Sequence, residues 1–255
     1  MNAVALAVDG PIGRITLNRP ERMNSVTVTL ATELEDALRE LGRRDDVNVV
    51  VLRGAGGNFC AGGDFDEVTR LRAAGAEALE ALFVAFRRAC ATIADIAVPV
   101  VAAVEGVAAA GGFELMQTAD IVLVSESARI SDNHIRFGMI PGGGSTARLP
   151  RLIGRQQAIA TLLSGDRLTG SDAVTHGLAY RAYPQNVFDE RVEAFLTALA
   201  GRSRRAVTTI KHLVDSGLRG TLEQALNREL EAVVDHIIDD GATSAAAFDS
   251  RKASS

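Results

Sequence analysis

Two glycine-rich stretches decide the fold of this chain: NFCAGGDF at residues 58–65 and AAAGGFE at residues 108–114. Each follows a run of β-forming residues, at 49–52 and at 98–104. Glycine lets another molecule approach the main chain closely, because it carries no side chain. Each turn can therefore leave a backbone N–H facing open space. Two such groups that converge on one point would bind a carbonyl oxygen and stabilise it as it becomes anionic.

The second stretch also carries a candidate acid–base group. Gly111 and Gly112 precede a predicted helix over 112–118, and the first N–H groups of a helix have no internal partners and favour negative charge. Glu114 follows three residues after Gly111, on nearly the same helix face. A carboxylate beside an oxyanion donor can transfer a proton at the carbon next to the carbonyl. These glycines can equally serve close packing alone, and this glutamate can serve the helix dipole alone.

Composition indicates one large α/β domain, or one domain with a small appendage. The chain has 255 residues, of which 47% are hydrophobic and 23% charged. Aromatic residues make up only 4%, so the core must be built from Ala, Val, Leu and Ile. The net charge of −5 argues against a nucleic-acid partner, since such proteins usually carry a basic stripe.

Cysteine usage and hydropathy indicate a reduced, cytoplasmic protein. Cys60 and Cys90 are the only cysteines, and their spacing is unlike that of a metal site. No basic segment precedes an apolar one at the N-terminus, so no signal peptide is expected. The apolar run at 96–110 is broken by a proline, a charge and a glycine, so it is too short to span a membrane. We therefore expect no metal and no membrane partner.

Hydrophobic periodicity predicts strands and helices in alternation, the rhythm of βαβ units and a mostly parallel sheet. The predicted strands are 4–8, 12–17, 47–52, 98–104 and 121–124, and the predicted helices between them are 29–43, 77–96 and 112–118. After Pro141 the pattern becomes mostly helical. Helices are predicted at 148–153, 156–163, 171–175, 188–199, 207–216 and 222–238, with 178–183 extended.

Further short motifs follow one another along nearly the whole chain. They are LNRP at 17–20 with Asn24, FCAGGD at 59–64, GGFE at 111–114, GMIPGGG at 138–144, RLP at 148–150, the segment 165–173, GL at 177–178, and Phe248 with Lys252. In this combination the chain resembles the crotonase superfamily, also called the enoyl-CoA hydratase/isomerase family. The combination is far more specific than any single motif.

The resemblance implies an α/β fold, a crotonase-like β-β-α spiral with a helical C-terminal trimerisation region. We expect residues 1–195 to form the spiral core with an acyl-CoA site and residues 196–255 to form the helical region. The resemblance further implies a homotrimer or hexamer and an acyl-CoA thioester substrate. No separate cofactor is expected, because coenzyme A is part of the substrate.

The same resemblance assigns roles to residues. By position, the oxyanion hole maps to the N–H groups of Gly63 and Gly111. The residues expected to bind coenzyme A are Arg22, Met23, Ala61, Asp64 and Phe65. Arg22 can equally be a solvated surface charge.

One position departs from the family pattern. Hydratases of this family use two glutamates, and the first matches Glu114. The second falls, on this alignment, at His134, which can be a second catalytic group because imidazole titrates near working pH. Asp132 lies two residues earlier and can orient the ring, or it can be a turn or capping residue. His134 can equally be a buried histidine with no catalytic duty.

We therefore expect an enoyl-CoA hydratase or isomerase that works through an enolate, with Glu114 as general acid and base. Two alternatives stay open. In the first, the protein is an acyl-CoA or β-dicarbonyl hydrolase that activates water with His134. In the second, it is a non-catalytic member that binds coenzyme A without turnover.

Overall fold

The computed structural model describes residues 2–252, and it describes side chains as far as residue 239. The chain divides into two compact units, Met1–Gly201 and Arg202–Ser255, which are described separately below. The side chains of Phe248 and Lys252, which contribute to the family resemblance, lie outside the described residues.

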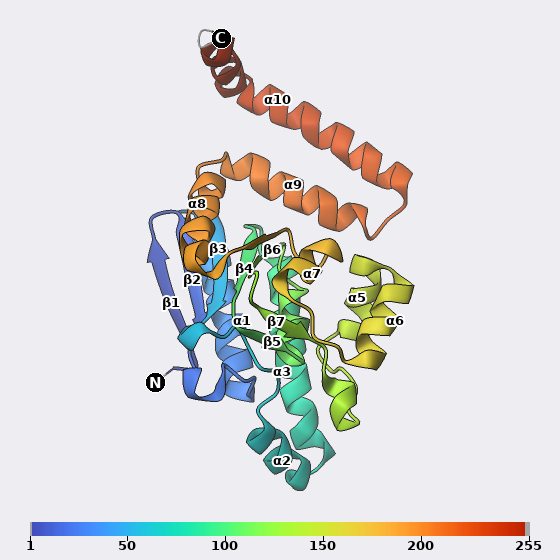
Figure 1. Ribbon diagram of the computed structural model, residues 1–255. Helices are drawn as coiled ribbons and strands as arrows, with labels where there is room; N and C mark the ends of the chain where they lie inside the picture. Colours follow the sequence, from blue (N-terminus) through green and yellow to red (C-terminus); the bar gives the residue numbers. More distant parts are fainter. Residues whose placement is uncertain (1, 253–255) are drawn as a thin grey trace. The chain divides into compact units, whose positions relative to one another are not determined.

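A mixed sheet forms the centre of the first unit (Figure 1). Within the described residues it has six strands in the order β1-β2-β3-β4-β6-β8. Their bounds are β1 Val4–Asp9, β2 Ile12–Leu17, β3 Val49–Gly54, β4 Val100–Val104, β6 Ile121–Ser125 and β8 Arg181–Tyr183. The β1–β2 pair is an antiparallel hairpin, as predicted, and all the other pairs are parallel. The predicted alternation of strands and helices around a mostly parallel sheet is thus confirmed.

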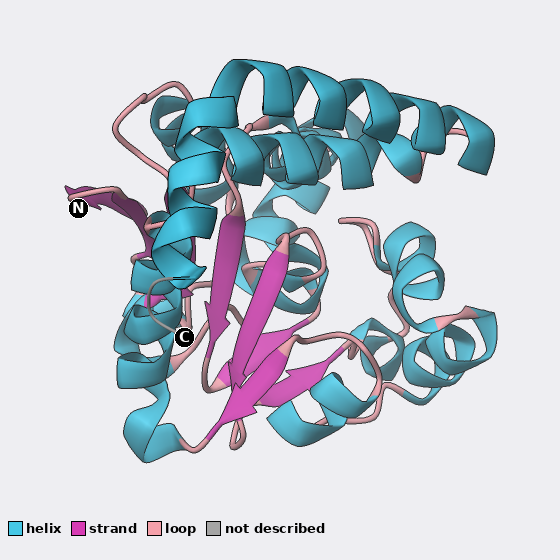
Figure 2. Ribbon diagram, turned by 90° about the horizontal axis from the view of Figure 1, so that it is seen from above, coloured by secondary structure: helices cyan, strands magenta, loops and turns pink. Residues whose placement is uncertain are grey.

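The central strands β3 and β4 are buried on both faces, which explains their continuous apolar runs. Side chains alternate between faces along a strand. In β3, Val50 and Leu52 join the core that contains helices α1 (Val28–Gly42) and α3 (Ala76–Asp95). Val49 and Val51 join a second cluster with helix α8 (Phe188–Ala200). Figure 2 shows helices on either side of the strands.

A small second sheet, which sequence periodicity does not predict, carries the chain from β4 to the second glycine turn. It pairs β5 (Val107–Ala109) with β7 (Arg129–Ser131) in parallel. Three-residue strands are too short to show a period. Because β5 leads to helix α4 (Gly111–Met116) through the single residue Ala110, this sheet determines where Gly111 lies.

Helix α2 (Phe65–Ala74) is also absent from the sequence prediction. Leu71 is its only buried residue, so the segment shows no apolar face from which a helix could be inferred. The helix begins at the first glycine turn, where the Asp64 side chain accepts a hydrogen bond from the Glu67 N–H. Such a cap stabilises a helix start by about 1 kcal/mol.

The other α-helices lie close to their predicted ranges, except that the last continues to Lys252, beyond its predicted end at residue 238. The short 3₁₀ helices are not among the predicted elements. The α-helices are α5 Ser145–Ile153, α6 Arg155–Ser164, α7 Gly170–Thr175, α9 Arg204–Gly217 and α10 Leu222–Lys252, and the 3₁₀ helices are η1 Pro20–Arg22, η2 Ala55–Gly57, η3 His134–Phe137 and η4 Gln185–Val187. No helix within residues 2–252 is long and apolar enough to cross a bilayer.

The division into units falls after Gly201, six residues beyond the boundary expected from the sequence. Helix α8 accounts for the difference. Its buried side chains Phe188, Val192 and Leu196 pack in the same cluster as the strands. The helix therefore stays with the sheet along its whole length, and the second unit begins with the segment before α9.

Candidate active site

The two glycine-rich stretches lie side by side in the first unit. Cys60 and Ala108 form a parallel bridge. The Cys60 N–H donates to the Val107 carbonyl at 2.9 Å, and the Ala109 N–H donates to the Cys60 carbonyl at 2.9 Å. Segments about fifty residues apart in the chain thus run together up to Gly63 and Gly111.

Close contact between the turns explains why they contain glycine. A Cβ on Gly62 would lie 2.7 Å from the Ala110 Cβ and 3.2 Å from the Gly111 nitrogen. A Cβ on Gly111 would lie 3.6 Å from the Gly63 nitrogen. A Cβ on Gly112 would lie 2.0 Å from the Cys60 carbonyl oxygen, so a side chain there would force the turns apart.

Neither the Gly63 N–H nor the Gly111 N–H donates a hydrogen bond to any residue that the structure describes. Most main-chain N–H groups are paired in folded proteins. Two free donors on adjoining turns are therefore a candidate site for one electron-rich oxygen.

Backbone strain occurs at the residue before Gly111. Ala110 has φ 47° and ψ −116°, a backbone conformation that residues other than glycine rarely adopt. Its N–H donates to the Ser131 carbonyl at 3.0 Å, which ties the strained turn to strand β7. Strain of this kind costs about 1–3 kcal/mol and concentrates at functional sites.

Glu114 is buried beside the second turn, with 2% of its surface exposed. Its Oε1 accepts hydrogen bonds from the Gly143 N–H at 2.7 Å and the Ser145 N–H at 3.1 Å. Burial raises the pKa of the Glu114 carboxyl, although these two bonds and the nearby His134 act in the opposite direction. With Oε1 held, Oε2 is the oxygen left for chemistry.

The His134 ring lies between the carboxylates of Glu114 and Asp132. Its Nε2 lies 4.0 Å from Oε2 of Glu114, and its Nδ1 lies 2.6 Å from Oδ1 of Asp132. Since a carboxylate only accepts, the Nδ1–H is the donor, which leaves Nε2 directed at Glu114. Burial lowers the pKa of His134, but the bond to Asp132 and the charges of both carboxylates outweigh burial and raise it overall.

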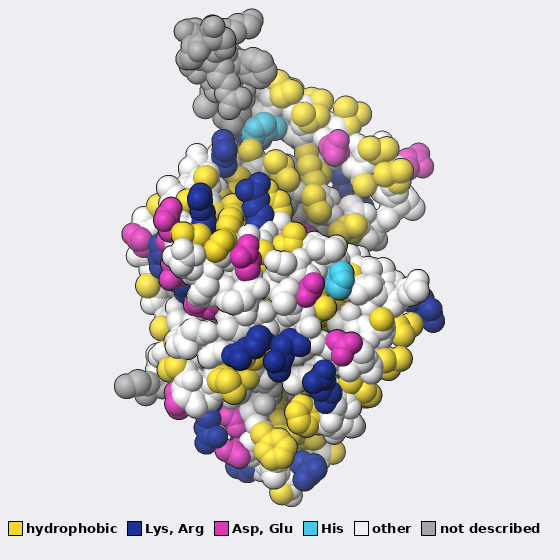
Figure 3. All heavy atoms as spheres, in the orientation of Figure 1, with side chains coloured by type: hydrophobic (Ala, Val, Ile, Leu, Met, Phe, Trp, Pro, Cys, Tyr) yellow, Lys and Arg dark blue, Asp and Glu magenta, His cyan; other side chains and the backbone are white. Residues whose placement is uncertain are grey.

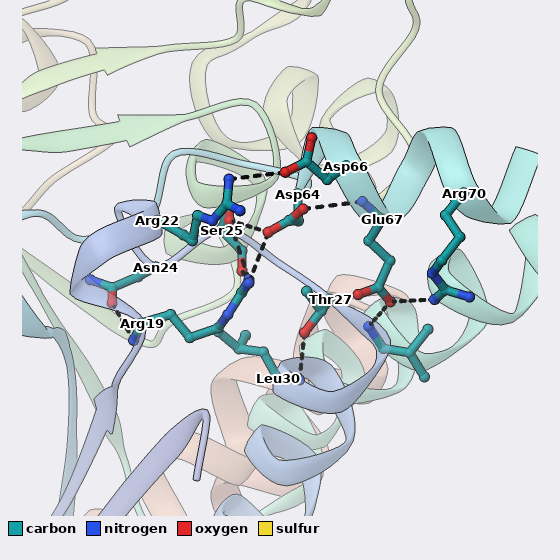
Figure 4. Close-up of polar contacts among 11 residues, drawn as sticks. Arg19, Arg22, Asn24, Ser25, Thr27, Leu30, Asp64, Asp66, Glu67 and Arg70 are labelled. Atoms are coloured by element: carbon teal, nitrogen blue, oxygen red, sulfur yellow. Dashed lines mark hydrogen bonds and ion pairs between the residues drawn. The ribbon is translucent and has the colours of Figure 1, made fainter. Parts of the chain in front are cut away.

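The residues expected to bind coenzyme A gather near the first turn, where Figure 4 shows the polar contacts. Phe65 is the first residue of α2 and is 79% exposed, and Met23 directly follows η1 and is 47% exposed. Arg22 is exposed and pairs with Asp66 at 3.0 Å. Ala61 donates its N–H to the Met23 carbonyl at 3.0 Å. The structure thus brings these residues together around one surface, and their contact with coenzyme A stays a prediction.

Asp64 differs from the other four because its carboxylate is buried and engaged within the protein. Oδ2 accepts from Arg19 at 2.8 Å and from the Ser25 hydroxyl at 3.1 Å (Figure 4). Oδ1 accepts the Glu67 N–H at 3.1 Å. These bonds lower the pKa of the carboxyl, against the opposing effect of its own burial. Asp64 therefore orients the first turn and helix α2, and its side chain is occupied.

Sequence reasoning missed the loop that holds Glu114. Gly143 and Ser145 lie 29 and 31 residues beyond it, and the glycine run at 142–144 does not by itself reveal its target. One signal was available, because free N–H groups at the start of the next helix suit an anion. Within the described residues no group of three or more metal-ligating side chains comes together.

Comparison with known proteins identifies the class. The family model for enoyl-CoA hydratase/isomerase matches residues 8–251. The fold is that of solved crotonase-fold proteins. An enoyl-CoA hydratase from Bacillus anthracis superposes with a TM-score of 0.91 at 28% identity, covering 98% of this chain and 96% of that one. One from Polaromonas sp. JS666 gives 0.92 at 26% identity, covering 97% of each.

A curated relative agrees with the family model. The mitochondrial enoyl-CoA hydratase of Pongo abelii is 31% identical over 86% of this chain and 73% of that protein. The chain belongs to the enoyl-CoA hydratase/isomerase family, the crotonase superfamily, as the sequence motifs predict.

Proposed function

We propose that this protein is an enoyl-CoA hydratase or isomerase that stabilises an enolate. The arrangement of Glu114 carries the proposal: a buried carboxylate with one oxygen clamped lies on the turn that also holds one of the two free N–H donors. Proton transfer next to a thioester needs both kinds of group, one for the proton and one for the charge that forms on oxygen.

In this proposal the thioester oxygen accepts hydrogen bonds from the N–H groups of Gly63 and Gly111. Removal of an α-proton, or addition to Cβ, moves negative charge onto that oxygen. Donors already in position stabilise the charge without reorganising, and one such donor is typically worth about 3–4 kcal/mol in the transition state. The start of helix α4 adds the favourable end of its dipole.

Hydration would use Glu114 and His134 as a pair. The water oxygen bonds to Cβ and its proton passes to one member of the pair, while the other member delivers a proton to Cα. The 4.0 Å between Oε2 and Nε2 is compatible with both groups facing the same reacting atoms. Isomerisation needs only one of them, since Glu114 can remove a proton and return it at another carbon.

Coenzyme A would lie along the surface formed by Arg22, Met23, Ala61 and Phe65. Phe65 offers an exposed ring for stacking, and Arg22 offers a charge for a phosphate that would take the place of Asp66 in its exposed ion pair. Asp64 would hold both segments in place through Arg19 and its cap on helix α2. A cytoplasmic location and the absence of a further cofactor stay predictions.

Hydrolysis is the second candidate, and the Asp132–His134 contact favours it. A histidine oriented by a buried carboxylate is a common means of activating water. Asp132 is 1% exposed and its Oδ1 lies 2.6 Å from the ring, so the pair is pre-formed.

A screen of 2-enoyl, 3-enoyl and 3-oxo thioesters with product identification tests the proposal. We expect 3-hydroxyacyl-CoA from 2-enoyl substrates, or a moved double bond from 3-enoyl substrates. Free coenzyme A as the main product would instead favour the hydrolase. Binding of thioesters with no turnover at all would favour a non-catalytic member. His134→Ala then separates the two preferred reactions, because isomerisation by Glu114 alone should survive it and hydration should not.

We also propose that the protein assembles as a trimer, or as a dimer of trimers. Helices α9 and α10 of the second unit expose apolar side chains at helical spacing. They include Ile210, Val214, Leu222, Leu226, Leu230 and Ile237, and Leu218 directly after α9 is exposed as well. Figure 3 shows apolar side chains gathered over α10. A patch of this kind usually marks an interface between proteins.

A further inference from the structure

Gln117 is a buried amide next to the candidate site that the proposed chemistry does not use directly. It closes helix α4 three residues after Glu114 and is 8% exposed. Its Nε2 donates to the Phe113 carbonyl at 3.0 Å and to the Ser145 hydroxyl at 2.9 Å. The carbonyl of Phe113 can only accept, so it fixes the nitrogen of the amide on this side.

The Ser145 contact connects Gln117 to Glu114. Ser145 is fully buried and begins helix α5, and its own N–H donates to Oε1 of Glu114. The other donor to Oε1, Gly143, is held separately, because Arg148 donates to the Gly143 carbonyl at 2.6 Å. Each of the two bonds to Oε1 thus has its own support, and Gln117 supports the one from Ser145.

The amide makes these contacts at a cost. Its Oε1 is buried and finds no hydrogen-bond partner among the described residues. An unpaired buried polar atom costs about 1–3 kcal/mol. An apolar side chain of the same shape would avoid that cost but would leave the buried Ser145 hydroxyl without its partner, so what the amide contributes here is its bond to Ser145.

We propose that Gln117 is a positioning residue: it anchors Ser145 so that the Ser145 N–H holds Oε1 of Glu114 and leaves Oε2 directed at the reacting atoms. The role rests on the proposed function of Glu114 as the acid–base group. Gln117 itself touches no substrate.

The test compares Gln117→Met and Ser145→Ala with the control Thr118→Val. Methionine keeps the length of glutamine and loses both donors. The control removes one side-chain bond, from Thr118 to the Leu115 carbonyl, at the end of the same helix and outside this chain of contacts. A double variant of Gln117 and Ser145 shows whether the two act through one bond.

Two readouts are used. The first is the carbon-13 signal of the Glu114 carboxyl in protein labelled at glutamate, assigned with Glu114→Gln and titrated with pH. Without the anchor on Ser145, its backbone N–H should hold the carboxylate less well, and the pKa of Glu114 should rise further in Gln117→Met and in Ser145→Ala. The second is kinetics with the best thioester, where kcat should fall on the order of tenfold with KM little changed. The double variant should match the single ones, because both substitutions break the same bond.

Three results would overturn the role of Gln117: an unchanged Glu114 titration in both single variants, the same titration shift in Thr118→Val, or additive losses in the double variant. The titration does not require turnover. If no thioester reacts while the Glu114 titration still shifts in both variants, the proposed function fails and the link from Gln117 to Glu114 stands.

Discussion

At the scale of single residues, the contact between His134 and Asp132 controls the candidate proton chemistry. The ring lies between two carboxylates, 2.6 Å from Asp132 and 4.0 Å from Glu114. Both charges raise the pKa of His134 and so favour its protonated form. Since the pKa of Glu114 is raised as well, the pair holds a proton up to a higher pH than the two groups would in water.

Asp132→Asn tests this electrostatic control. The amide can still accept from Nδ1 but has lost the charge, so the pKa of His134 should fall. The alkaline limb of kcat/KM should then move to lower pH, as measured across a pH series with the best thioester. The acid limb, governed by Glu114, should move less. An alkaline limb that stays in place would show that His134 does not titrate in the reaction.

The same substitution has a consequence for stability. A histidine whose pKa is raised on folding contributes stability below its unfolded value of 6.5 and loses that contribution as pH rises through the folded value. Asp132→Asn should therefore lower the free energy of unfolding more at acidic pH than at alkaline pH. Urea titrations at two pH values, one on each side of this range, measure the difference.

At the scale of elements, the close approach of the two glycine turns positions the candidate donors. Gly62 has φ +104°, and a Cβ there would lie 2.7 Å from that of Ala110. Gly62→Ala should thus push the turn of Gly63 away from that of Gly111. A misplacement near 1 Å can cost about a hundredfold in rate, so kcat should fall by about that factor.

Gly57→Ala is the matched control. Gly57 also has a positive φ, +73°, but a Cβ there meets nothing within 4 Å. Both substitutions place a side chain at a positive φ, which L-residues rarely adopt, and only Gly62→Ala adds the clash. Equal kcat values for the two variants would contradict a role for the close approach. Unfolding by urea shows how much of any loss is due to stability.

Some helices and strands can be predicted from the sequence and others cannot, for physical reasons. The long strands and helices follow from apolar periodicity, which is local in sequence. The strands β5 and β7 are too short for a period, and α2 buries only Leu71. The spiral arrangement is predicted only by the resemblance to the family. The residues around Cys60 and Ala108 carry no local pattern that indicates their pairing.

The candidate site divides in the same way. Glu114, Gly63 and Gly111 can be recognised from the sequence because each lies in or beside a glycine-rich turn that follows a run of β-forming residues. The clamp from Gly143 and Ser145, and the bond from Arg19 to Asp64, join residues 29 to 45 positions apart. Contacts at that range depend on the packing of whole elements, so a single sequence does not specify them.

At the scale of the whole molecule, the proposed trimer would depend on the exposed apolar side chains of α9 and α10, which form an apolar stripe on the second unit. Leu226→Glu places a charge within the stripe on α10, and Asn227→Glu places one on the next residue, about 100° around the helix. Light scattering should give about three or six times the 26.9 kDa chain mass for the unaltered protein and for Asn227→Glu. Leu226→Glu should give smaller species. A monomer for the unaltered protein would contradict the trimer.

In the proposed function, the N–H groups of Gly63 and Gly111 and the Glu114 carboxylate together make the carbon next to a thioester acidic. Exchange of the α-protons of a saturated acyl-CoA in heavy water tests this most directly, because it needs no double bond, no water addition and no knowledge of the pathway. We predict that mass spectrometry will find deuterium at Cα with the unaltered protein. Glu114→Gln should slow incorporation by about a thousandfold or more and retain acyl-CoA affinity. Absence of exchange across a range of acyl chains that do bind, or equal exchange in Glu114→Gln, would contradict the account.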